Sequence, residues 1–116
     1  MFLIYYVAMS EQQLFGLHAS ICQTLANPKR LEIIARLRAG EKTVTELAEA
    51  MRISQANLSQ HLALMRQKGI LLARREGVNI HYRISNPKIV RACDLMRQVL
   101  LENLETDMRL VRASRN

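Results

Sequence analysis

The chain has 116 residues, with 17 lysines and arginines against 10 aspartates and glutamates, which gives a net charge of +7 at pH 7. This length fits one small domain. With only 4% aromatic residues, its core must be built from aliphatic side chains and the six methionines, which suits helices. A domain of this size buries roughly two-thirds of its unfolded surface, so association with a second copy is expected to stabilise it. The excess positive charge favours a polyanionic partner, either a nucleic acid or an anionic membrane surface.

The chain carries two cysteines, too few for a disulfide framework. Its first residues do not show the pattern of a secretory signal, a charged segment followed by a longer apolar run. We therefore expect a cytoplasmic protein with reduced thiols. The first eight residues, MFLIYYVA, are apolar but far fewer than the roughly 20 that cross a bilayer. Three interpretations of them stay open: an extension packed on a dimer, a translated leader before a start at Met9, and an anchor on a membrane surface.

Two helices are predicted in the first third of the chain. Ser10 is a typical N-cap, and the apolar residues that follow recur at helical spacing: Leu14, Leu17, Ile21 and Leu25. Asn27 then caps a second helix that begins with Pro28, because proline at the first helical position has no N–H to lose. This second helix is predicted to bury Leu31, Ile34 and Leu37 and to end at Gly40.

The next two helices are short and closely spaced. Thr43 and Glu46 form a capping-box pattern for a third helix, and Ser54 caps a fourth helix that ends at Gly69. The side chains predicted to face the core are Leu47, Ala48 and Met51 on the third helix and Leu58, Leu62 and Met65 on the fourth. A helix, a short turn and a capped helix in this order are typical of a helix-turn-helix unit.

A basic hairpin and a long helix are predicted to complete the chain. Residues 70–75 and 80–84 form two strand-like runs whose connection contains Gly77 and Asn79, which suit a tight turn. Asn86-Pro87 opens the final helix, along which the apolar positions are Ile89, Cys93, Met96, Leu100, Leu104, Met108 and Val111. This stripe is longer than a core of this size needs, so part of it is expected to bury against another protomer, together with the first helix.

Four ordered motifs carry a family resemblance: TLANPKRLEII from Thr24, TVTELA from Thr43, SQANLSQHL from Ser54 and RREGVNIHY from Arg74. Over roughly residues 14–102 the sequence resembles the ArsR/SmtB family. The resemblance implies a mainly α fold with a β-hairpin wing, a winged helix-turn-helix that dimerises through its first and last helices. It also implies a homodimeric repressor that leaves double-stranded operator DNA when a metal ion, metalloid or oxidant binds. We assign residues 1–9 to an N-terminal extension, 10–112 to this DNA-binding and dimerisation domain, and 113–116 to a tail.

The outer face of the fourth helix carries short or amide side chains near its N-terminus: Ser54, Gln55, Ala56, Ser59 and Gln60. Glutamine can pair with adenine, serine can donate to bases or phosphates, and alanine can contact a thymine methyl group. On the hairpin, Arg74, Arg75 and Arg83 are candidates for phosphate neutralisation, as are Lys29, Arg30 and Lys68 elsewhere. The alternative for each of these residues is a solvated surface position. His61, at the edge of the buried stripe, is predicted to pack or to touch a phosphate.

The metal and persulfide sites that the resemblance implies are missing from their usual positions. Thiolate sensors of the family carry cysteines where this chain has Thr43 and Thr45. Zinc sensors carry an Asp, two His and a Glu on the last helix at the positions of Asn86, Lys88, Val99 and Glu102, of which only the glutamate matches. The cysteines of the persulfide-sensing branch fall on Ala35 and Leu101.

The candidate sensor residues that remain are Cys22, Cys93 and His18, the last lying one helical turn before Cys22. Three interpretations stay open: buried small side chains, a thiol-based redox or sulfur switch, and coordination of As(III) or another thiophilic metal ion. A trigonal thiolate site needs three sulfurs, which only ligands from two protomers would supply.

A DNA-binding repressor is therefore the leading function. An enzyme is not expected, because the sequence shows no set of nucleophile, base and orienting residue and no glycine-rich phosphate loop. The alternative is a winged-helix module that binds protein or a membrane surface without inducible DNA release, although no membrane partner is expected.

Overall fold

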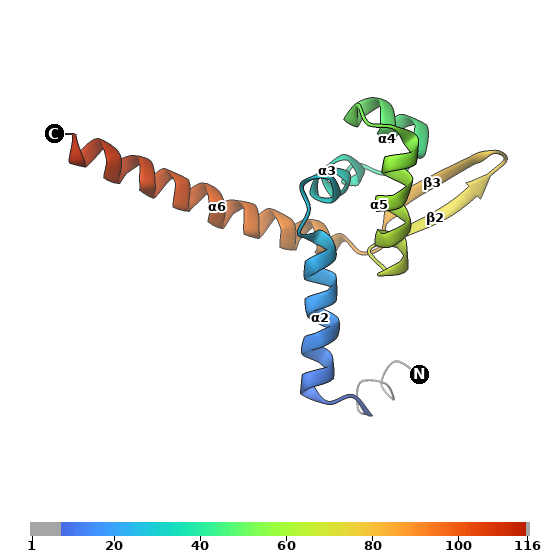
Figure 1. Ribbon diagram of the computed structural model, residues 1–116, viewed down its shortest axis with the longest axis horizontal. Helices are drawn as coiled ribbons and strands as arrows, with labels where there is room; N and C mark the ends of the chain where they lie inside the picture. The colour runs from blue at the N-terminus through green and yellow to red at the C-terminus, as the bar shows by residue number, and fades with distance from the viewer. Residues whose placement is uncertain (1–7, 116) are drawn as a thin grey trace. The chain divides into compact units, whose positions relative to one another are not determined.

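The computed structural model describes residues 8–115, which form two compact units, one ending at Ser85 and the other beginning at Asn86. The first unit contains α2 (Glu11–Leu25), α3 (Pro28–Leu37), β1 (Lys42–Thr43), α4 (Val44–Met51), α5 (Gln55–Gln67), β2 (Leu71–Glu76) and β3 (Asn79–Ile84) (Figure 1). The second unit is the single helix α6 (Pro87–Ser114). Of the helices in residues 8–115, none is both long and apolar enough to cross a membrane. Of the N-terminal extension predicted at residues 1–9, residues 1–7 lie outside the described residues.

The predicted helix caps are confirmed. Ser10 and Gln13 form a reciprocal capping box at the start of α2, as Thr43 and Glu46 do at the start of α4. The Asn27 side chain accepts hydrogen bonds from the backbone N–H groups of Lys29 and Arg30, at 2.9 and 3.2 Å. These caps satisfy N–H groups that a helix leaves without partners at its start, so the beginnings of the helices are set locally.

The hairpin belongs to a three-stranded antiparallel sheet in the order β1-β3-β2. The third strand, β1, pairs Lys42 with Tyr82 and Thr43 with His81, and it was not predicted from the sequence. A strand of two residues is too short to show an alternating pattern. Gly77 lies in the turn between β2 and β3 with a φ of 62°, a left-handed conformation that glycine adopts without strain.

The core lies between α3, α4, α5 and the base of the sheet. The predicted inward residues of α4 and α5 are all buried, and the fully buried large side chains are Ile33, Leu47, Leu58, Leu62, Met65, Ile70 and Leu71. One prediction for α3 is wrong, because Leu31 is 45% exposed in this protomer and Ile33 takes its place in the core. Two residues apart on a helix, these side chains point in directions about 160° apart, so one face cannot bury both.

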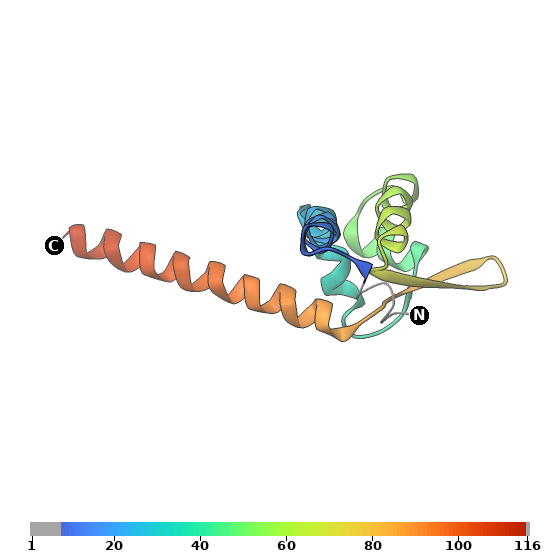
Figure 2. The same ribbon diagram turned by 90° about the horizontal axis from the view of Figure 1, so that it is seen from below.

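The two helices predicted to meet a partner expose apolar side chains. No residue of α6 between Pro87 and Ser114 is buried, and this unit is a single uninterrupted helix (Figure 2). Its large exposed apolar residues are Leu95, Met96, Val99, Leu100, Leu101, Leu104, Met108, Leu110 and Val111. On α2, Leu14, Phe15, Leu17 and Ile21 are also exposed. Exposed apolar surface on this scale is typical of sites of association.

Candidate DNA-binding interface

The pair α4 and α5 forms the predicted helix-turn-helix. Residues 52–54 connect the two helices, and the Ser54 side chain accepts a hydrogen bond from the Asn57 backbone N–H at 3.1 Å to begin α5. Leu47 and Met51 of α4 are buried together with Leu58 of α5. Because these side chains are close-packed, the angle between the two helices is held by the core.

The candidate base-reading residues Ser54, Gln55, Ala56, Ser59 and Gln60 are all exposed at the N-terminal half of α5. The opposite side of the same helix is fully buried, so the core fixes which face is outward. The Gln55 side chain donates to the Thr45 hydroxyl at 3.4 Å, which links it to α4. The Ser54 Oγ accepts the capping hydrogen bond and keeps its own O–H available as a donor.

The hairpin of β2 and β3 extends away from α3, α4 and α5 (Figure 1) and carries the three candidate arginines. Arg74 stands opposite His81 and Arg75 stands opposite Ile80. Because successive side chains of a strand point to opposite faces, Arg74 and Arg75 lie on different faces of the hairpin. Arg83 pairs with Leu72 and so shares the face of Arg74. All three arginines are exposed, but they do not form one surface.

Arg74 is engaged by two carboxylates. Its Nε and Nη2 atoms lie 2.8 and 2.6 Å from Glu41 Oε1, and its Nη1 atom lies 2.8 Å from Glu76 Oε2. These hydrogen bonds raise the pKa of Arg74, and the bond from Arg74 lowers the pKa of Glu41. His81 lies between the same carboxylates, 3.5 Å from Glu41 and 3.6 Å from Glu76. Among residues 8–115, Arg75 and Arg83 form no ion pair of this kind.

Arg30, a candidate for phosphate contact, forms hydrogen bonds to other elements of the fold. Its Nε–H donates to His61 Nδ1 at 3.1 Å and its Nη1 donates to the Thr24 carbonyl at 3.2 Å, which joins α3 to α5 and to the end of α2. Burial, followed by the charges of Arg30 and Lys29, lowers the pKa of His61. Because its Nδ1 accepts a hydrogen bond, the neutral ring carries its proton on Nε2. No local pattern in the sequence predicts this link, because its partners are 31 residues apart.

The candidate sensor residues lie on both units. His18 and Cys22 are exposed on α2, whereas Cys93 is half-buried on α6. Burial, with a smaller contribution from the Asp94 carboxylate, raises the pKa of the Cys93 thiol. Within residues 8–115 of one protomer, no group of three or more His, Cys, Asp or Glu side chains could hold a metal ion.

Comparison with known proteins places this fold and this surface in a family. The sequence model described as "Bacterial regulatory protein, arsR family" matches residues 27–71, from the start of α3 to the start of β2. The HTH-type transcriptional regulator Rv0081 of Mycobacterium tuberculosis is 34% identical over 93 residues, which cover 79% of this chain and 82% of that protein. The arsenical resistance operon repressor of Escherichia coli is 42% identical over 72 residues, 61% of this chain and 62% of that protein.

Solved structures agree with the sequence comparison. The crystal structure of Rv0081 has a TM-score of 0.75 at 33% identity and covers 82% of this chain and 96% of that chain. The solution structure of a homodimeric winged helix-turn-helix DNA-binding domain from Mycobacterium bovis has a TM-score of 0.75 at 32% identity, with 85% and 94% covered. The predicted winged helix-turn-helix fold is confirmed. The chain therefore belongs to the arsR family of bacterial regulatory proteins, which are transcriptional regulators and not enzymes.

Proposed function

We propose that this chain is a homodimeric, sequence-specific repressor that places α5 in the major groove of operator DNA and uses residues 70–84 as a wing. The observation that carries the proposal is the exposed face of serine, glutamine and alanine at the start of α5, held outward by a fully buried opposite face. Such side chains suit base edges in the major groove. A protein that acts on bacterial operator DNA works in the cytoplasm, and we place this chain there.

Base reading by α5 is tested with Gln55→Ala and Gln60→Ala. On an operator selected from a random-sequence pool, each variant is expected to lose about 1–3 kcal/mol of binding free energy, with little loss on random DNA. Gln67→Ala removes an exposed amide from the other end of α5 and serves as the matched control. Equal losses on both DNAs would assign Gln55 and Gln60 to backbone positioning. If the wild-type protein binds the two DNAs equally well, this result would favour the alternative function, a module that binds protein or a membrane surface.

Phosphate neutralisation by the wing is tested with Arg74→Ala, Arg75→Ala and Arg83→Ala. Arg75→Ala and Arg83→Ala should each lower the slope of log affinity against log salt by up to about 1, on all DNA sequences alike. We expect a smaller change for Arg74, because Glu41 and Glu76 already hold its guanidinium group. If the triple variant has the same salt slope as the wild type, the wing does not contact the DNA phosphates.

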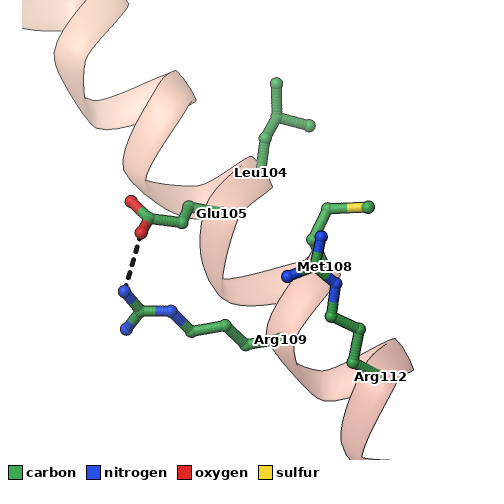
Figure 3. Close-up of a pocket in the computed structure, with 5 residues that line it drawn as sticks. All are labelled: Leu104, Glu105, Met108, Arg109 and Arg112. Carbon is green, nitrogen blue, oxygen red and sulfur yellow. Dashed lines mark hydrogen bonds and ion pairs between the residues drawn. The ribbon is translucent and has the colours of Figure 1, made fainter. Parts of the chain in front are cut away.

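We further propose that dimerisation buries the exposed apolar stripes of α2 and α6. The similar domain from Mycobacterium bovis is homodimeric, which supports the same assembly here. A shallow hollow of about 480 Å³ on α6 is lined by Leu104 and Met108 and flanked by the Glu105–Arg109 ion pair and Arg112 (Figure 3). An apolar surface with charges at its margin is typical of a protein interface. A two-fold axis would place two copies of α5 about 34 Å apart, one turn of DNA.

For the inducer, we propose thiol chemistry at Cys22 and Cys93, with His18 as an auxiliary ligand. The similar repressor from Escherichia coli controls an arsenical resistance operon, which supports a thiophilic species such as As(III). Because one protomer offers no metal-binding cluster among residues 8–115, such a site would draw ligands from two protomers. A disulfide is the second chemical form of the same switch: two thiols lose two electrons and two protons to an oxidant.

A further inference from the structure

Arg52 has an unusual backbone conformation. It ends α4 with φ 57° and ψ 44°, and within residues 8–115 it is the one residue other than glycine with a positive φ. Its N–H donates to the carbonyls of Ala48 and Glu49, and the Ile53 N–H donates to the Ala48 carbonyl at 3.2 Å. These bonds close the last turn of α4 in the manner of a Schellman motif, so the left-handed conformation is required for the chain to turn into α5.

Glycine suits this position better than arginine does. A side chain in the left-handed region is strained by the contact of its Cβ with the backbone, and glycine avoids that contact. Arg52 is exposed, and in the described part of the protomer its side chain forms no ion pair or capping bond that would offset the strain. An arginine held under strain at a position where glycine would satisfy the fold indicates a functional side chain.

We propose that Arg52 binds a phosphate at the rim of the major groove and thereby sets the position of α5 in the groove. This inference rests on the proposed function. When a helix-turn-helix docks, its first helix crosses the DNA backbone and its second helix enters the groove, so the turn between them passes beside the phosphates. Arg52 lies in that turn, two residues before Ser54, and its long charged side chain is exposed. A contact of this kind positions the protein without reading sequence.

Three variants distinguish the effect of the charged side chain on DNA binding from the effect of the strained backbone on stability. Arg52→Gly removes both the charge and the strain, Arg52→Asn removes the charge and tolerates the left-handed conformation, and Arg52→Lys keeps the charge. At equal protein concentration, Arg52→Gly should raise the unfolding midpoint by about 4 °C or more. It should also bind operator and random DNA about fivefold more weakly for each copy in contact, with the salt slope lowered by about 1 per copy. Arg52→Asn should show the same loss of binding, and Arg52→Lys should keep the wild-type salt slope.

A more stable variant that binds DNA less well cannot be explained by damage to the fold. An Arg52→Gly protein with wild-type affinity and salt slope would overturn this inference and leave the proposed function standing. A loss confined to the selected operator would overturn it as well, because that pattern belongs to a base contact. Wild-type protein without salt-dependent DNA binding would overturn the proposed function together with the inference.

Discussion

Replacing Leu100 with aspartate is expected to leave a monomer that binds operator DNA about a hundredfold more weakly, or worse. Leu100 lies in the middle of the apolar stripe of α6 and is 55% exposed in the single protomer. In the proposed dimer its side chain is buried, where an unpaired carboxylate is strongly unfavourable. Two linked DNA-binding units gain about 10² to 10⁴ in affinity over one, and this gain is lost when the dimer dissociates.

Sedimentation at micromolar concentration measures the assembly, and binding to the selected operator measures the consequence. Gln98→Glu is the matched control, since it adds the same charge to an exposed polar position on the opposite side of α6 without removing an apolar side chain. This control should remain dimeric and bind DNA nearly as the wild type does. A Leu100→Asp protein that sediments as a dimer would contradict the proposed use of this stripe.

The double variant Cys22→Ser, Cys93→Ser is expected to bind operator normally and to lose its response to thiol reagents. In the wild type, arsenite or the oxidant diamide should lower operator affinity about tenfold or more, within the usual range for coupled sites. The reason is geometric: a bridge between the two proposed interface helices changes the relation of the protomers and hence the spacing of the two copies of α5. Because the pKa of Cys93 is raised, its thiolate fraction and its rate of reaction should increase with pH above neutrality.

Intact mass and thiol titration show which cysteines react, and operator binding shows the effect. His18→Gln separates the two chemistries, because a metal or metalloid site would lose a ligand while a disulfide would not. Retained release by arsenite or diamide in the double variant would leave the cysteines without a sensing role. The same result would place the response at residues other than cysteine, because Cys22 and Cys93 are the two cysteines of the chain.

Much of the fold could be predicted from the sequence because its signals are local. Ser10, Asn27, Thr43 and Ser54 cap helices through bonds to residues two or three positions away, so the sequence contains both partners of each bond. The outward position of the polar face of α5 was predicted in the same way, from the helical spacing of its apolar residues. Local bonding and periodicity therefore determined the elements and the candidate recognition surface.

The tertiary structure decided what depends on residues distant in the chain. The engagement of Arg74 by Glu41 joins positions 33 residues apart. The link between Arg30 and His61 spans 31 residues. The exchange of Leu31 for Ile33 in the core depends on which side of α3 faces the other elements. The backbone at Arg52 depends on how α4 turns into α5. In each case the sequence contained the residue types, but only packing in three dimensions determined which partner each one has.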